Sequence, residues 1–314
     1  VSGSAVADAS AIGSLLIPWH KRLGYPPAFS AATLAAAATI DILIPPSIPM
    51  ILFALTANAS IAALFVAGIL PGILMCVGFM FMCWWVGKRR NFPRDTTPIN
   101  WSEFRVHLLY SSPALLLPVL IVLFLRFGIA TPTEVAVLST LYAAAVSVVV
   151  YRDLSLKRLN DAVVHAGLAT GVVLLVIMAS AAIGWLLTYD QMPTGVAHWI
   201  QQNVSQGWIV ILIMNLLMLF IGMFIDLPAA VLLLTPVFLP LAESIGMDPV
   251  QLGIMMVVNL AVGLYTPPVG TTLFITSALA KVKVGQTVRE LGPFYFVAFL
   301  VLALVSYVPA SILR

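Results

Sequence analysis

The chain has 314 residues, of which 61% are hydrophobic and only 9% are charged, and its mean hydropathy is +1.08. A soluble domain carries about a quarter of its residues as charged groups. The composition therefore excludes a soluble globular protein and indicates several membrane spans of about 20 apolar residues each. The net charge of +3 is small and the basic residues lie in predicted loops, so we expect contact with membrane lipid and not with nucleic acid.

Proline, glycine and charged residues divide the chain into predicted elements. In chain order, the first part contains an apolar piece at 8–20, a long segment at 27–57 broken at Pro45-Pro46, a span at 61–87, a surface stretch at 100–108, and spans at 111–127, 134–151 and 160–189. An interfacial helix is expected at 193–205. The remaining apolar segments are 208–225, 228–242, 249–280 with a break at Pro267-Pro268, and 292–312.

The sequence Thr131-Pro132-Thr133-Glu134 places an acidic residue at the start of a predicted span. Its spacing is that of a capping box, in which Thr131 caps the helix and Glu134 reaches back to the cap. We therefore predict a structural role for Glu134.

The basic residues are unevenly distributed between the two sides of the predicted topology. If Lys21 faces the cytoplasm, alternation of the spans places all but two of the 15 Lys and Arg residues on that side, with Arg126 and Arg314 opposite. This distribution follows the positive-inside rule.

Two parts of the chain share a spacing that predicts an internal repeat. Asp8 precedes Pro18 by ten residues, as Asp226 precedes Pro236. We match these two pairs as the starts of copy one and copy two.

The copies also share the spacing from a glycine to a double proline. Gly24 precedes Pro45-Pro46 by 21 and 22 residues, as Gly246 precedes Pro267-Pro268. Together with the aspartate match, this requires a four-residue difference in the loop before each glycine. The number of predicted crossings between the two glycines is odd, so the copies have opposite topology, as in secondary transporters.

Each copy opens with two short apolar arms around a polar tip. In copy two the arms are 208–225 and 228–242, with Asp226 at the tip. A helix of about 15 residues rises only ~22 Å, which is short of a hydrocarbon core of about 30 Å. We therefore predict re-entrant hairpins, and place the tip of copy one at Ser2-Gly3-Ser4.

Each copy then contains a helix interrupted by a double proline. Proline lacks an N–H and blocks the carbonyl four residues back, so each pair frees backbone oxygens at membrane depth. Unwound carbonyls with a hydroxyl can bind Na⁺, and the N-terminus of the next half-helix attracts an anion. Asp41 at a break and Asp226 at a tip are candidate functional acids, because ionisable groups are costly in a membrane.

A channel and an intramembrane hydrolase are the alternative function classes. A channel needs a continuous polar path, whereas a pair of hairpins favours two gates around one site. A hydrolase needs a Ser/His or paired-Asp constellation or a motif such as H-E-x-x-H, and the sequence has none. We expect a transporter and not an enzyme, with a channel as the alternative.

Five ordered motifs resemble the large membrane subunit of tripartite ATP-independent periplasmic (TRAP) transporters. They are Ser-Gly-Ser-Ala-Val-Ala-Asp (2–8), Ile-Pro-Pro-Ser-Ile-Pro (44–49), Gly-Ile-Ala-Thr-Pro-Thr-Glu (128–134), Gly-Met-Phe-Ile-Asp (222–226) and Gly-Leu-Tyr-Thr-Pro-Pro-Val-Gly (263–270). The resemblance covers the whole chain. It implies an all-α polytopic membrane protein of the elevator type, with an inverted repeat, two re-entrant hairpins and two proline-broken helices.

The resemblance also implies a function and partners. The expected function is Na⁺-coupled import of an organic acid, such as a C4-dicarboxylate or a sialic acid, across a bacterial inner membrane. The expected partners are a small membrane subunit (DctQ-like) and a periplasmic substrate-binding protein (DctP-like) that delivers the solute. Na⁺ is the expected coupling ion, and no cofactor is expected.

Carried over by position, the resemblance implies two Na⁺ sites and one substrate site. The first ion site combines the tip with the backbone of the first break: Ser2, Gly3, Ser4, Asp41, Ile44 and Pro46. The second combines Gly222, Gly263, Thr266 and Val269. The substrate is expected between the tips, near Ser4, Ser47, Asp226 and Thr271.

Position 41 departs from the family pattern, which has glycine there, as this chain has at Gly263. Asp41 either adds a ligand, alters the choice of ion or points elsewhere, and we expect it to be a ligand.

We expect four parts in the chain: a first repeat core at 1–57, scaffold and connecting helices at 58–206, a second repeat core at 207–280, and a C-terminal helix at 281–314. The chain begins at Val1 and not at methionine. Relative to the family, we expect it to lack N-terminal helices and the first arm of hairpin one.

Overall fold

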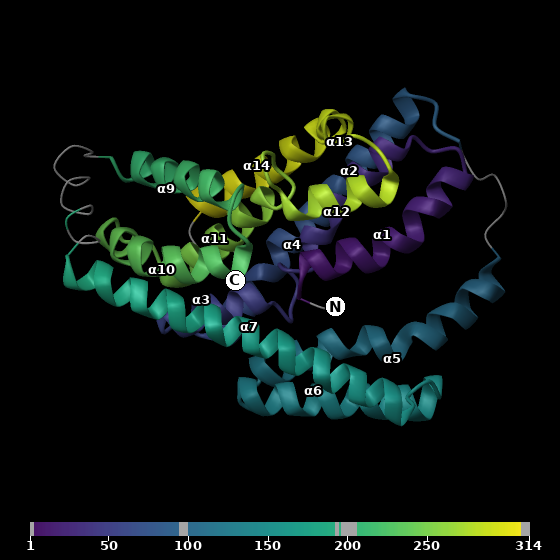
Figure 1. The fold of residues 1–314 in the computed structure, drawn as a ribbon, viewed down its shortest axis with the longest axis horizontal. Helices are drawn as coiled ribbons and strands as arrows, with labels where there is room; N and C mark the ends of the chain where they lie inside the picture. Colours follow the sequence, from purple (N-terminus) through teal and green to yellow (C-terminus); the bar gives the residue numbers. More distant parts are fainter. Residues whose placement is uncertain (1–2, 94–99, 192–194, 196–205, 309–314) are drawn as a thin grey trace. The chain divides into compact units, whose positions relative to one another are not determined.

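A computed structural model describes residues 3–93, 100–191, 195 and 206–308 of the chain (Figure 1). Every regular element in these ranges is a helix, in agreement with the all-α expectation. Ser2 and nearly all of the predicted interfacial helix at 193–205 lie outside the described residues. The chain divides into two compact units: unit 1 contains Val1–Pro93 and Ala179–Arg314, and unit 2 contains Arg94–Met178.

The described part of unit 2, from residue 100 onward, contains three long helices. They are α5 (Trp101–Arg126), α6 (Pro132–Val146) with a π-helical turn at Ser147–Tyr151, and most of α7 (Leu156–Tyr189). α5 packs against α6, where the Tyr142 hydroxyl donates a hydrogen bond to the carbonyl oxygen of Pro113 at 2.8 Å.

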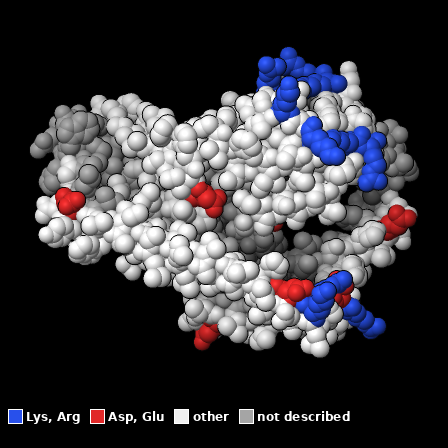
Figure 2. Space-filling model, in the orientation of Figure 1, with Lys and Arg blue, Asp and Glu red and all other residues white. Residues whose placement is uncertain are grey.

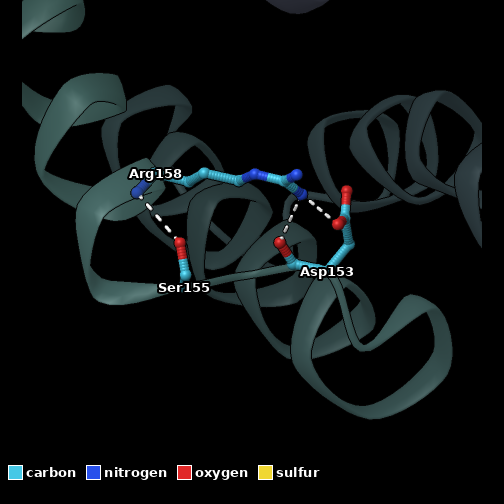
Figure 3. Close-up of polar contacts among 3 residues, drawn as sticks. All are labelled: Asp153, Ser155 and Arg158. Carbon is cyan, nitrogen blue, oxygen red and sulfur yellow. Dashed lines mark hydrogen bonds and ion pairs between the residues drawn. The ribbon is translucent and has the colours of Figure 1, made fainter.

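The link between α6 and α7 is held by local polar contacts (Figure 3). Arg158 forms an ion pair with the Asp153 carboxylate and donates to the Asp153 carbonyl oxygen at 2.8 Å. The backbone N–H of Arg158 donates to Ser155 Oγ at 3.3 Å. These contacts satisfy one of the donors that the first turn of a helix leaves unpaired.

The capping box at the start of α6 is confirmed. The N–H of Glu134 donates to Thr131 Oγ1 at 3.4 Å, and Glu134 Oε2 accepts a hydrogen bond from the Thr131 N–H at 2.7 Å. Glu134 therefore has the structural role that its spacing predicted.

The predicted boundary between a surface stretch at 100–108 and a span at 111–127 is wrong, because α5 continues through Pro113. Pro113 has no N–H for the carbonyl of Leu109, but the Ser112 hydroxyl donates to that carbonyl at 2.8 Å. This local replacement allows the helix to pass the proline.

Unit 1 contains two sets of helices in the same order. The first set is α1 (Ala5–Arg22), α2 (Pro27–Ala37) with a 3₁₀ turn at Ala38–Ile40, α3 (Ile48–Ala57) and α4 (Ile61–Arg89). The second set, preceded by α9 (Gly207–Gly222), is α10 (Leu227–Ser244), α11 (Pro249–Gly263), α12 (Thr271–Ala280), and α13 (Val284–Glu290) followed by α14 (Gly292–Tyr307).

The helix bounds of the two sets match more closely than the residue spacings in the sequence did. α1 and α10 have 18 residues each, and α3 and α12 have 10 each. Gly24 and Gly246 both have positive φ, 84° and 74°, in four-residue loops after α1 and α10. The predicted four-residue difference between these loops is therefore wrong.

The alignment of copy one with copy two therefore also changes. Ser4 and Asp226 are the N-caps of α1 and α10, and Pro18 matches Pro240. Asp8 lies in the first turn of α1, so it does not correspond to Asp226. The shared feature is the position of the cap, which spacing between like residues did not reveal.

The two sets pack against each other reciprocally (Figure 1). α12 packs on α1 and α2, while α3 packs on α10 and α11. α11 forms the centre of the unit, since every residue from Val250 to Gly263 is buried. α4, α9 and α14 all pack on α11.

Within the described residues, five helices are long and apolar enough to cross a membrane: α4, α5, α6 with its π turn, Leu156–Ile183 of α7, and α10. A sixth results if α13 and α14, bent by 58° at their junction, form one span. α10, with 18 residues, rises ~27 Å at 1.5 Å per residue. α10 is therefore long enough to be a candidate span, contrary to the expectation that this arm is too short to cross.

The described Lys and Arg residues of unit 1 gather at one end of its helices (Figure 2). Arg90 at the end of α4 pairs with Glu290 of α13 at 2.6 Å, and Lys21 Nζ at the end of α1 donates to Ala280 O of α12 at 2.5 Å. The basic set of this end comprises Lys21, Arg22, Lys88, Arg89, Arg90, Lys281, Lys283 and Arg289.

Candidate functional site

The described residues of the predicted tip of hairpin one, Gly3 and Ser4, contact break one, the irregular stretch 41–47 between α2 and α3. The Ser4 N–H donates to Asp41 Oδ2 at 3.0 Å. A Cβ atom on Gly3 would lie 2.9 Å from the carbonyl oxygen of Pro46 and 3.3 Å from the nitrogen of Ile48. Gly3 has φ +67°, so glycine is required for both its conformation and its close approach. The N-termini of α1 and α3 thus meet here, where the Asp41 carboxylate is favoured by the helix dipole.

The backbone oxygens of break one differ in their partners. The Ile42 oxygen accepts a hydrogen bond from the buried Ser47 hydroxyl at 2.6 Å. Within the described ranges, no hydrogen bond ends on the carbonyl oxygens of Ile44 and Pro46. The Ile44 side chain packs on α4, where a Cβ on Gly72 would lie 2.8 Å from its Cγ1. Two oxygens of the predicted ion site are therefore not engaged by a hydrogen-bond donor among the described residues.

The tip of hairpin two contacts break two, the stretch 264–270 between α11 and α12, by glycine packing. A Cβ on Gly263 would lie 2.5 Å from both the carbonyl carbon and oxygen of Gly222. Nearby, the Gly270 N–H donates to the Met223 oxygen at 3.4 Å. The structure therefore brings together Gly222 and Gly263, and this approach excludes any side chain at 263.

The backbone of break two also divides into held and available oxygens. The Leu264 oxygen accepts hydrogen bonds from the N–H and the hydroxyl of Thr272, at 3.0 and 2.9 Å. The Thr266 hydroxyl donates to the Val262 oxygen at 2.6 Å and also contacts the Tyr295 side chain. No hydrogen bond from a described residue ends on the carbonyl oxygens of Thr266 and Val269.

The predicted substrate residues are separated in their contacts. Ser47 is buried and caps α3, whereas Asp226 is exposed and precedes α10. Thr271 Oγ1 is buried and has no partner in the part of the chain that the structure describes. No hydrogen bond between described residues connects these three side chains, so their grouping around one substrate stays a prediction.

The side chains available for metal binding restrict the kind of cation. Among the described residues, no three His, Cys, Asp or Glu side chains gather where they could hold a metal ion. A cation at either break would be held mainly by carbonyl and hydroxyl oxygens, which suit a hard ion such as Na⁺.

The structure adds residues that the sequence pattern did not single out. Thr272 joins break two to α2, because its hydroxyl also lies 3.2 Å from the Ala35 oxygen. Asn259 Nδ2 donates to the backbone and side-chain oxygens of Asn215, at 2.9 and 2.8 Å, and links α11 to α9. An amide in an apolar segment is a signal for such a contact, since a buried amide needs a partner.

Tyr295 of α14 also reaches break two. Its hydroxyl donates to the Tyr265 oxygen at 2.9 Å. No local pattern in the sequence indicated this contact.

The chain matches the family described as "Tripartite ATP-independent periplasmic transporter, DctM component" over residues 1–311. It is 59% identical over 310 residues to "Uncharacterized protein y4mL" of Sinorhizobium fredii, covering 99% of this chain and 74% of that protein.

Two further relatives carry substrate names. Over 310 residues the chain is 36% identical to "C4-dicarboxylate TRAP transporter large permease protein DctM" of Pseudomonas aeruginosa, covering 99% of this chain and 72% of that protein. Over 309 residues it is 35% identical to "Sialic acid TRAP transporter large permease protein SiaM" of Vibrio cholerae, covering 98% and 72%. With its apolar helices, the chain therefore belongs to the DctM family of TRAP transporter permeases and is a multi-pass protein of the bacterial inner membrane.

Proposed function

We propose that this chain is the translocating subunit of a Na⁺-coupled carrier that imports an organic acid. One observation carries the proposal: each hairpin tip contacts the break of a proline-broken helix, Ser4 with Asp41 and Gly222 with Gly263. Such contacts enclose backbone oxygens at two related points, as a carrier with paired ion sites requires.

The position of the breaks supports re-entrant hairpins. Break two has 15 residues of α11 on one side and 10 residues of α12 on the other. Those helices rise ~22 Å and ~15 Å, so a tip that touches the break lies well inside the length of the pair. Hairpin two then enters and leaves on the same side, whatever the length of α10.

The matched helix lengths and the reciprocal packing of α3 and α12 support an inverted repeat. An inverted repeat provides two conformations of similar energy, which face opposite sides of the membrane. We propose elevator-type transport, in which the two breaks and their hairpins move together with the substrate.

The two breaks are proposed to hold one Na⁺ each. The available oxygens of Ile44 and Pro46 serve the first ion, and those of Thr266 and Val269 serve the second. The gathering of basic residues at one end of unit 1 favours the cytoplasm for that end.

The substrate and partners are proposed from the family. Relatives are named for C4-dicarboxylate and sialic acid, both organic anions. The helix N-termini at the two tips attract negative charge, which supports the same class of solute. A small membrane subunit and a periplasmic binding protein would complete the transporter.

Uptake in proteoliposomes tests this function. The chain, its small subunit and its binding protein are reconstituted, and initial rates of C4-dicarboxylate and sialic-acid uptake are measured against Na⁺ at fixed potential. A carrier gives saturable uptake that rises more steeply than first order in Na⁺. Uptake unchanged when choline replaces Na⁺ would exclude Na⁺ coupling, and uptake that does not saturate with solute would indicate a channel.

A further inference from the structure

Break two is also bonded to α14, a helix that belongs neither to hairpin two (α9 and α10) nor to the broken helix (α11 and α12). Tyr295 of α14 donates its hydroxyl hydrogen to the Tyr265 carbonyl oxygen at 2.9 Å. The rings of Tyr265 and Tyr295 stack at a centroid distance of 5.4 Å, and Phe299 continues the stack at 6.1 Å. Tyr265 is fully buried, so water does not compete for its carbonyl.

This hydrogen bond acts on a single peptide unit. The Tyr265 carbonyl and the Thr266 N–H belong to the same peptide plane, which is rigid. Its oxygen is held by Tyr295, and its N–H donates to the Gly263 oxygen at 3.0 Å. Both ends of the plane are thus fixed, and this limits the backbone rotation of Thr266, whose carbonyl is the next one along the chain.

Thr266 is the first of four successive break-two residues, 266–269, whose carbonyl oxygens accept no hydrogen bond from the described residues. The oxygens of Leu264 and Tyr265 are occupied by Thr272 and Tyr295. Thr272 and Tyr295 therefore occupy the first two carbonyl oxygens of break two, and the next one, that of Thr266, is the first without a donor among the described residues.

Break one has no counterpart of this tyrosine. When the starts of α4 and α13, Ile61 and Val284, are matched, Tyr295 corresponds to Gly72. Gly72 packs closely on break one, and a Cβ there would lie 2.8 Å from Ile44 Cγ1. The hydroxyl is thus specific to the second break.

Resting on the proposed function, we infer that Tyr295 is a positioning residue for the second cation site. Its hydroxyl orients the Tyr265–Thr266 peptide so that Thr266 presents its oxygen to Na⁺. It does not touch the ion, and the first site is independent of it.

The test compares Tyr295→Phe with Tyr307→Phe. Tyr307 lies on the same helix and also donates its hydroxyl to a backbone oxygen, that of Trp208, at 3.3 Å. The thermal unfolding midpoint of each purified protein is measured against NaCl, with choline chloride keeping ionic strength constant. Uptake is then measured against Na⁺ with the partner subunits present.

Tyr295→Phe is expected to raise the Na⁺ concentration for half-maximal stabilisation about tenfold, as the loss of a hydrogen bond that orders a buried carbonyl predicts. The Na⁺ curve for uptake should become less steep, whereas Tyr307→Phe should match the wild type in both assays. Equal Na⁺ curves for Tyr295→Phe and wild type overturn the inference, even if the midpoint in choline falls. A wild type that does not respond to Na⁺ in either assay overturns the proposed function and the inference together.

Discussion

The two breaks of unit 1 occupy matching positions, but each is bonded to a different neighbour: break one to its hairpin tip and break two to α14. Break one is bonded to its own hairpin tip by a side chain, Asp41 to the Ser4 N–H, and packs on α4 through Gly72. Break two is bonded to α14 by a side chain, Tyr295, and its tip contact is made by Gly222 and Gly263.

The acidic residues Asp41 and Asp226 also lie at different places in the two copies. Copy one has serine at the tip and aspartate at the break, whereas copy two has Asp226 at the tip and Gly263 at the break. Each matched pair therefore contains one carboxyl group, from opposite partners. The comparison assigns Asp41 to a tip contact, and its part in an ion site stays a prediction.

The largest expected effect is at the glycine contact of break two. Gly263→Ala should reduce uptake by about tenfold or more, because the new Cβ meets backbone atoms of Gly222, and overpacking of this kind costs about 1–3 kcal/mol. Uptake and thermal stability of the variant are measured together. Gly285→Ala, where the added Cβ meets nothing within 4 Å, is the matched control and should behave as wild type. Normal uptake by Gly263→Ala would mean that tip two does not need this close approach.

Asp41 gives the next largest effect. Asp41→Asn can still accept the hydrogen bond from Ser4 but lacks the charge, whereas Asp41→Gly loses both. We expect Asn to weaken apparent Na⁺ affinity by about threefold to tenfold and lower the steepness of the Na⁺ curve, in proportion to one lost charge interaction. Asp41→Gly should add a loss of thermal stability.

The control for these variants is Asp161→Asn, an exposed acid of α7. If Asp41→Asn keeps the wild-type Na⁺ curve while Asp41→Gly loses stability, Asp41 bonds the tip and takes no part in Na⁺ binding.

Ser47 should have a moderate effect confined to break one. Its hydroxyl donates to the Ile42 oxygen and accepts from the Met50 N–H, so it caps α3. Ser47→Ala should lower stability by about 1 kcal/mol, the usual cost of a lost N-cap. Counted from the double proline, Val269 holds the matching position in copy two, and Val269→Ala should change stability less. Equal losses in the two variants would contradict the asymmetry.

The smallest effect is expected at Tyr265. Its hydroxyl is buried and has no partner among the described residues, so Tyr265→Phe removes a group that gains nothing from burial. The thermal unfolding midpoint should stay the same or rise slightly. A clear fall in the midpoint would show that the Tyr265 hydroxyl has a hydrogen-bond partner, as the Tyr295 hydroxyl does.

Local rules in the sequence were enough for several features. The membrane class follows from composition, and the capping box of Thr131 and Glu134 needs only neighbours three residues apart. The breaks at Pro45-Pro46 and Pro267-Pro268 follow from the missing N–H of proline. Each of these depends on groups close in the chain, so spacing is sufficient evidence.

The contacts that shape the site depend on tertiary structure. Ser4 and Asp41 are 37 residues apart, and Tyr295 and Tyr265 are 30 apart. No periodicity links such pairs, because their meeting depends on how the helices pack. The register of the two copies changed for the same reason: Asp8 and Asp226 look alike in sequence, but only the helix starts show that Ser4 is the match of Asp226.

By itself the sequence determined a polytopic membrane protein with two proline-broken helices, because hydropathy and proline act through the local backbone. Tertiary structure alone decided which groups close each break. A carboxylate or a tyrosine hydroxyl holds a break in place only where packing brings a buried backbone group within hydrogen-bond distance of it.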